Sequence, residues 1–148
     1  MPRAATRSKA APFSIRLTRS TDRFVADEAR RTRRSKSAIV EMLTEEAAQM
    51  RRFPGIGFRG ADANRRAWLI GASVDVWHVI EAYQSFGSVE RMAAGTDLEE
   101  SQIRLALAYW AQYPDDIDEA IAQNRMPIDE ARDLYPFIRY RDLGELSG

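Results

Sequence analysis

The chain has 148 residues, of which 45% are hydrophobic and 30% charged, a composition that fits one or two small globular domains. It contains no cysteine and one histidine, His78, which excludes disulfides, a thiol nucleophile and metal sites built from Cys or clustered His. No apolar run approaches the roughly 18 residues of a membrane span, and no apolar stretch follows the basic N-terminus. We therefore expect a cytoplasmic protein with no membrane partner.

The net charge of zero hides a division between the two halves of the chain. Residues 1–52 contain 13 Lys and Arg against 6 Asp and Glu, a net charge of +7, whereas residues 53–148 contain 9 against 16, a net charge of −7. The basic half suits a polyanion and the acidic half does not.

The first 52 residues predict a strand followed by two helices. Residues 1–11 are small, basic and aperiodic, so we expect a disordered arm. Over residues 13–18, FSIRLT, apolar and polar side chains alternate as in a half-exposed strand. Thr18 or Ser20 can cap a first helix, and Ser35 can cap a second. The expected apolar stripes are Phe24, Val25 and Ala29 in the first helix, and Ile39, Met42, Leu43 and Met50 in the second.

Phe53-Pro54-Gly55 ends the second helix and marks a domain boundary. Residues 56–60 and 66–71 predict a β-hairpin, and a helix with Val76, Val79, Ile80 and Tyr83 on one face follows. Gly87 ends that helix and Ser88 caps a short one. Thr96 to Glu99 match a capping box for a helix lined by Ile103, Leu107 and Trp110, which Pro114 stops before a last helix at 115–124. The chain thus divides into 1–11, 12–52, 53–125 and a tail at 126–148, with a mainly α fold.

A single short strand on two helices is not stable alone, because its edge needs a partner and about 40 residues is near the lower limit for independent folding. Pairing with the same strand of a second copy gives a two-stranded antiparallel ribbon and an obligate dimer. Phe13, Ile15 and Leu17 then face the shared core, while Ser14, Arg16 and Thr18 face outward. Such a ribbon fits the major groove of DNA.

Residues 12–52 resemble the ribbon-helix-helix family, the Arc/MetJ/CopG class of repressors and antitoxins. The resemblance is carried by FSIRLT, by the helix TRSTDRFVADEARRT and by SKSAIVEML at 35–43. It implies that Ser14, Arg16 and Thr18 contact base edges, and that Ser35, Lys36 and Ser37, with Arg34, contact phosphates at a helix N-terminus. The family often has Gly before this helix, whereas Arg33 and Arg34 stand here, so we expect a differently shaped turn.

Residues 53–125 resemble a small homeodomain-like domain of unknown function that recurs in VapB-type antitoxins. The resemblance is carried by PGIGFRG, VDVW at 74–77, SVERMAA and ALAYWAQYPDDID. The short helix and the next one form a helix-turn-helix, but Glu99 and Glu100 lead the second helix and would repel phosphates. We therefore expect this motif to pack, dimerise or hold a protein rather than bind DNA.

Several side chains in this half have simple structural interpretations. Asp115, Asp116, Asp118 and Glu119 are read as a solvated helix face rather than a metal site, and His78 as structural. The aromatic residues are read as core, with one or two as candidate partner anchors: Trp68, Trp77, Tyr109, Trp110 and Tyr113. We expect no cofactor and no metal. Without a nucleophile–base pair, a phosphate-cradling glycine loop or a ligand set, an enzyme is not expected.

Antitoxins of this class usually neutralise the toxin with C-terminal residues, so the resemblance implies a toxin-binding segment in the tail. Its candidate residues are Tyr135, Phe137, Ile138, Arg139, Tyr140 and Arg141. A PIN-type ribonuclease is a natural target, because an arginine such as Arg139 or Arg141 could block its acidic metal site. The favoured function is an antitoxin that binds operator DNA as a homodimer or higher even oligomer and represses its own operon. The alternative is a stand-alone ribbon-helix-helix transcriptional regulator whose C-terminal domain senses a ligand or sets the oligomeric state.

Overall fold

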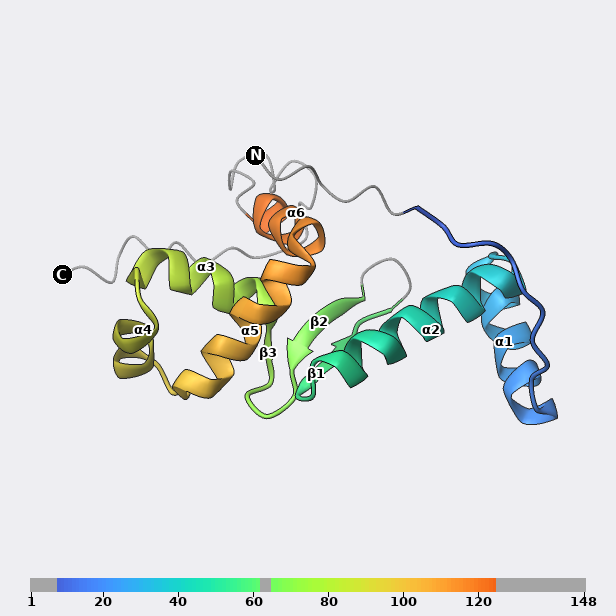
Figure 1. Ribbon diagram of the computed structural model, residues 1–148, viewed down its shortest axis with the longest axis horizontal. Helices are drawn as coiled ribbons and strands as arrows, with labels where there is room; N and C mark the ends of the chain where they lie inside the picture. Colours follow the sequence, from blue (N-terminus) through green and yellow to red (C-terminus); the bar gives the residue numbers. More distant parts are fainter. Residues whose placement is uncertain (1–7, 62–64, 125–148) are drawn as a thin grey trace, which may run out of the picture.

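A computed structural model describes residues 8–61 and 65–124, which form six α-helices and a small antiparallel sheet. The expected mainly α class is confirmed. In Figure 1, α1 lies at one end of the molecule, the sheet and α3 to α6 lie at the other, and α2 runs from α1 to the sheet. The elements are α1 (Arg19–Thr32), α2 (Lys36–Arg52), β1 (Ile56–Arg59), β2 (Arg66–Leu69), β3 (Val74–Asp75), α3 (Val76–Phe86), α4 (Val89–Gly95), α5 (Glu100–Gln112) and α6 (Pro114–Asn124). Within the described ranges every helix is too short or too polar to cross a bilayer.

The helix boundaries follow from local capping chemistry. The hydroxyl groups of Thr18, Ser35 and Ser88 accept hydrogen bonds from backbone N–H groups three residues later, and so cap α1, α2 and α4. Gly87 ends α3 with φ of 82°, a left-handed conformation that glycine adopts without strain. These four boundary predictions are confirmed.

The predicted capping box at Thr96 and Glu99 is wrong. Glu99 is itself the N-cap of α5, and its backbone N–H donates to Oε1 of Gln102 at 2.9 Å. Thr96 instead donates its hydroxyl to the carbonyl of Met92 at 2.8 Å and thereby closes the end of α4. The box is shifted by three residues, because Gln102 supplies the same reciprocal acceptor that Glu would. Pro114 follows α5 as expected and also begins α6.

The predicted hairpin is confirmed, and a third strand extends it. β1 and β2 pair antiparallel, with Ile56 opposite Leu69 and Gly57 opposite Trp68. β3 pairs with β2 through only two residues, Val74 and Asp75, which is too short a run to give a strand signal in the sequence. The sheet order is therefore β1-β2-β3.

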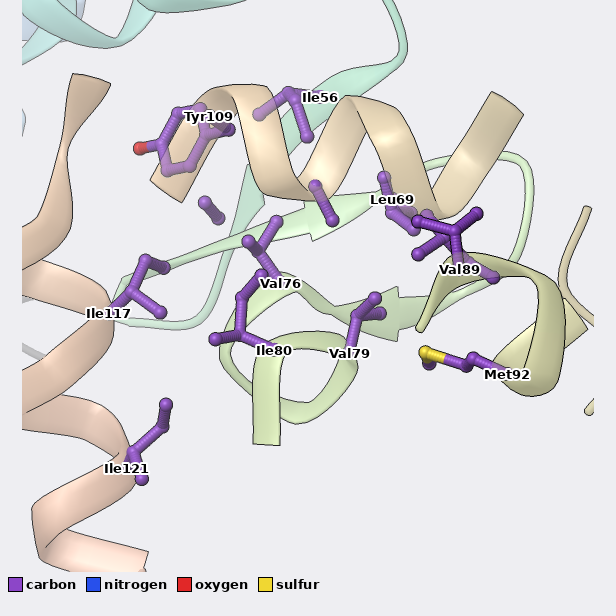
Figure 2. Close-up of a cluster of buried hydrophobic side chains, with 13 residues drawn as sticks. Ile56, Leu69, Val76, Val79, Ile80, Val89, Met92, Tyr109, Ile117 and Ile121 are labelled. Atoms are coloured by element: carbon purple, nitrogen blue, oxygen red, sulfur yellow. The ribbon is translucent and has the colours of Figure 1, made fainter. Parts of the chain in front are cut away.

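The main hydrophobic core joins the sheet to α3, α4, α5 and α6. Figure 2 shows its side chains converging from all of these elements. Tyr109 of α5 is the largest fully buried side chain, and its exposed fraction is 1%. The buried members are Ile56, Ala67, Leu69, Val76, Val79, Ile80, Val89, Met92, Ile103, Ala106, Tyr109, Ile117 and Ile121. We call residues 53–124, as far as they are described, the bundle unit.

A second, much smaller cluster joins α1 to α2. Its buried members are Val25, Ala29 and Ile39, against which Leu17, Val40 and Leu43 pack. The prediction that Phe24 belongs to the buried stripe is wrong, because 51% of its surface is exposed. Val25 and Ala29 lie four residues apart on the face toward α2, and Phe24 is rotated about 100° away from that face. We call residues 8–52 the helix-pair unit.

Candidate nucleic-acid interface

Residues 13–18 form no strand in the single chain. A strand needs hydrogen bonds to a neighbouring strand, and among the described residues the backbone of residues 13–17 has no such partner in the one copy that the structure holds. Only the carbonyl of Thr18 is bonded, because it accepts from the N–H of Asp22 in the first turn of α1. Figure 1 shows the segment, in blue, running along the outside of the helix pair before α1 begins. The predicted ribbon therefore requires a second copy of the chain.

The side chains of this segment keep the predicted alternation. Phe13, Ile15 and Leu17 line a groove of about 640 Å³, whose other wall is the face of α2 that carries Val40, Thr44 and Ala48. Ser14 and Arg16 lie outside the lining of that groove and are exposed. The apolar side chains are far from covered, since 84% of Phe13 and 53% of Ile15 remain exposed. One edge of the segment is thus apolar and directed at α2, and the other is polar and faces solvent.

The three residues predicted to contact bases have different surroundings. Ser14 and Arg16 are exposed, and Arg16 forms no ion pair within residues 8–61 and 65–124. Thr18 is also exposed, but its hydroxyl is occupied as the N-cap of α1: it accepts from the N–H of Thr21 at 3.4 Å and donates to Oγ1 of Thr21 at 3.0 Å. The polar groups of Ser14 and Arg16 are therefore accessible to a ligand, whereas the hydroxyl of Thr18 caps α1.

The turn between α1 and α2 is built without glycine. Arg33 adopts the left-handed conformation with φ of 56° and ψ of 38°, and the backbone N–H groups of Arg33 and Arg34 both donate to the carbonyl of Ala29. The expectation of a differently shaped turn is wrong, because Arg33 takes the conformation that glycine would take, at a cost of roughly 1 kcal/mol. Arg33 and Arg34 are exposed, and within the described part of the chain neither has an ion-pair partner.

The residues predicted to contact phosphates lie together at the start of α2. Ser35 accepts from the N–H of Ala38 at 3.1 Å, which leaves the N–H groups of Lys36 and Ser37 at the positive end of the helix. The ammonium of Lys36 lies 2.5 Å from the carboxylate of Asp22, an exposed pair between the starts of α1 and α2. Water and salt weaken such a pair, so the Lys36 ammonium can exchange Asp22 for a phosphate.

A contact of the N-terminal arm was not foreseen from the sequence. Lys9 binds Glu41 of α2 at 2.5 Å, and this contact raises the pKa of Lys9. Both side chains are exposed, so the contact is screened by water and salt, and the ammonium stays charged at neutral pH. Nothing in the spacing of Lys9 and Glu41, 32 residues apart, could have indicated this pair.

The helix-pair unit buries only a small amount of apolar surface. Val25 and Ile39 are fully buried and contribute about 1.5–3 kcal/mol each at most, and the single methyl group of Ala29 contributes less. A partner that covered the exposed side chains of Phe13, Ile15 and Phe24 would add to the buried apolar surface of this unit.

The consecutive helices α4 and α5, predicted to form a helix-turn-helix, present an acidic edge at the start of α5. Glu99 and Glu100 are exposed at the start of α5, and Arg104 of the same helix is paired with Glu100 at 3.1 Å and with Glu90 of α4 at 3.8 Å. A helix that begins with carboxylates, and whose arginine is already paired, offers little attraction to phosphates.

The bundle unit holds a separate cavity between the hairpin and α6. It has a volume of about 420 Å³, and its walls combine Arg65 and Arg66 with Asp116 and Glu119. The aromatic part of the lining is Phe58, Trp77 and Tyr109. A cavity of this size and mixed polarity can hold a small molecule that carries both charges.

The remaining aromatic and acidic residues have local structural partners. Trp77 donates to Asp75 at 3.1 Å and stacks on exposed His78 at a centroid distance of 5.2 Å. Trp110 donates to Asp118 at 2.8 Å, and Arg59 lies over the ring of Trp68. Tyr109 is core as expected. Trp77, Trp110 and Tyr113 are half-buried against that core, and Trp68 is half-buried beneath Arg59. Asp115, Asp116, Asp118 and Glu119 are exposed on α6, and among the described residues no group of three or more carboxylate or His side chains could hold a metal.

The predicted toxin-binding residues, Tyr135 to Arg141, lie outside the described residues. Comparison of the chain with protein families, curated proteins and solved structures finds no match.

Proposed function

We propose that the chain binds double-stranded DNA as a homodimer, through a ribbon formed by residues 13–18 of both copies, and that it acts as an autorepressing antitoxin. The observation that carries the DNA-binding part is the alternation at Phe13 to Leu17. The apolar side chains line a groove on α2 and stay largely exposed, while Ser14 and Arg16 face solvent. A second copy would bury the first set and leave the second set on an outer face.

Two features of the helix-pair unit support the same proposal. Its small core leaves apolar side chains that a second copy could cover. Its polar edge, the uncommitted Arg33 and Arg34 and the N-terminus of α2 lie in the half of the chain that has a net charge of +7. We assign base recognition to Ser14 and Arg16, and phosphate binding to Lys36, Ser37 and Arg34. Thr18, as the N-cap of α1, positions the end of the ribbon segment, and Ser35, as the N-cap of α2, positions the phosphate-binding N–H groups.

The antitoxin part of the proposal rests on the resemblance and on the acidic second half of the chain. A toxin such as a PIN-type ribonuclease would be held by the bundle unit and by residues 135–141. The test is to express the product of the gene that adjoins this one, with and without this chain. Growth arrest that this chain relieves supports the antitoxin function, and an adjoining product without toxicity contradicts it.

A second candidate, a ligand-responsive regulator, is favoured by the cavity of about 420 Å³ between the hairpin and α6. Trp77 lines that cavity, so a bound small molecule should change the fluorescence of the protein. A zwitterionic amino acid with an apolar side chain is the probe that its charges suggest. A saturable change that also shifts DNA affinity supports this candidate, and silence across a panel of such amino acids contradicts it.

The sharpest test of base recognition is Arg16→Ala, with Arg104→Ala as the matched control. Arg16 would donate two hydrogen bonds to a guanine, so its removal should weaken binding to the selected DNA by about 10- to 100-fold and binding to random DNA much less. Arg104→Ala removes an exposed arginine from the acidic face of α5 and should leave both affinities unchanged. Titration of labelled duplexes gives the affinities. If Arg16→Ala binds the selected DNA as the wild type does, the ribbon assignment is wrong.

A further inference from the structure

Helix α2 lies in the helix-pair unit, and its last turn contacts the bundle unit. Its first half carries Ile39, whose exposed fraction is 1%, into the small cluster with Val25 and Ala29. Its 17 residues span ~25 Å and contain neither glycine nor proline. The two units are therefore joined by continuous helix rather than by a linker.

The last turn of α2 is anchored on the bundle unit by polar and aromatic contacts. Gln49 accepts a hydrogen bond from the hydroxyl of buried Tyr109 at 2.9 Å, and Arg52 donates to the hydroxyl of Tyr113 at 3.3 Å. The ring of Phe53 meets the rings of Tyr109 and Tyr113 edge-on, at centroid distances of 5.5 and 6.0 Å. These contacts fix the direction in which α2 leaves the bundle unit.

The middle of α2 is held by the hairpin through one ion pair. The guanidinium of Arg65, just before β2, binds both carboxylate oxygens of Glu46, with Nη2 to Oε2 at 3.1 Å, and its Nη1 donates to the carbonyl of Gly60 at 2.9 Å. The pair is largely shielded, since 31% of the Arg65 side chain and 16% of the Glu46 side chain are exposed. A two-point arginine–carboxylate contact fixes orientation as well as distance.

We propose that Arg65 is a positioning residue for DNA binding, which couples the bundle unit to the helix pair through Glu46 and α2. The coupling itself stands on the contacts above, and its effect on DNA rests on the proposed function. The core between α1 and α2 is too small to fix the geometry of the helix pair. Because α2 is anchored on the bundle unit, the large core of that unit limits the motion of α2 and, through it, of α1. Whatever binds the bundle unit and shifts Arg65 then changes DNA affinity, and DNA in turn stabilises the bundle unit.

The first test is hydrogen exchange of the full chain with Arg65→Gln, without DNA and at fixed protein concentration. Loss of the clamp should speed exchange in peptides of α1 and of the first half of α2 by about fivefold, while peptides of α3 and α5 keep their protection. Arg104→Gln, which removes an exposed pair with Glu100, is the control and should change neither region. Faster exchange confined to the hairpin would overturn the coupling. Loss of protection in α3 and α5 would show that the variant unfolds the bundle, and Glu46→Gln, altered on α2 instead, then decides the question by the same readout.

The second test adds the DNA upstream of the gene and follows exchange in α3 and α5. In the wild type the duplex should slow exchange there, although these helices lie at the far end of α2, and in Arg65→Gln this effect should be lost. Bound DNA with unchanged exchange in α3 and α5 would overturn the coupling to DNA. Absence of DNA binding would contradict the proposed function instead, and the first test would still decide whether Arg65 couples the two units.

Discussion

At the scale of single residues, Arg33 shows how neighbouring hydrogen bonds hold a residue in a backbone conformation that is unfavourable for a side chain with a Cβ. The residue has φ of 56°, and two backbone N–H groups converge on the carbonyl of Ala29 to hold it there. The sequence places a helix end at Thr32 and a cap at Ser35, and those two signals leave only a tight turn between them. Arg33 therefore accepts the left-handed conformation despite its side chain.

Arg33→Gly should stabilise the folded protein, because glycine adopts this conformation without the Cβ penalty. The expected gain is about 1 kcal/mol, or roughly 3 °C in Tm, measured by thermal unfolding at fixed concentration. The control is Arg34→Gly: Arg34 does not have positive φ, so the same change should give no gain. An unchanged or lower Tm for Arg33→Gly would mean that the arginine side chain contributes contacts that offset the strain.

At the scale of elements, the helices could be predicted from the sequence and the long-range pairs could not. Ser35, Gly87 and Ser88 give local signals of helix ends, and the structure has those ends where the signals lie. The pairing of Glu46 with Arg65, or of Gln49 with Tyr109, depends on how the elements pack, and residue type and spacing contain no information about it. Two-residue β3 and the Glu99 cap were missed for lack of a pattern long or specific enough.

The candidate DNA-binding residues divide in the same way. The alternation from Phe13 to Leu17 is a local pattern, and the side chains follow it even though no strand forms in one copy. The capping role of Thr18 and the ion pair of Lys36 with Asp22 depend on the approach of α1 and α2, so the sequence did not separate them from free DNA-contacting groups.

The segment before α1 should be the dimer contact, and Ile15→Asp tests it. Ile15 is 53% exposed in one copy and would be buried in two, so each dimer would bury two carboxylates at a cost that raises the dimer Kd by about 100-fold or more. Sedimentation equilibrium gives the mass. Ile70→Asp places the same charge on an isoleucine that is 48% exposed in the bundle unit and should leave the dimer intact. An unchanged dimer Kd for Ile15→Asp would contradict dimerisation through residues 13–18.

At the scale of the whole molecule, the chain joins a basic half to an acidic half through α2, whose last turn contacts the acidic half. The helix-pair unit lies in the positively charged half, which attracts DNA, but its hydrophobic core is small. The bundle unit has the large hydrophobic core, but it lies in the negatively charged half, which repels DNA. The basic half thus supplies the positive charge, and the acidic half supplies the stable core. An interaction with phosphates should therefore be confined to one end of the molecule and should depend strongly on salt.

Sequence reading by the ribbon is decided by binding of the full chain to the DNA upstream of its gene and to random DNA of equal length, over a series of salt concentrations. We predict tight binding that favours the upstream DNA, with a logarithm of the affinity that falls linearly and steeply as the logarithm of salt concentration rises. Equal and weak binding to both duplexes would contradict a sequence-reading ribbon and would leave the basic half as a structural or purely electrostatic module.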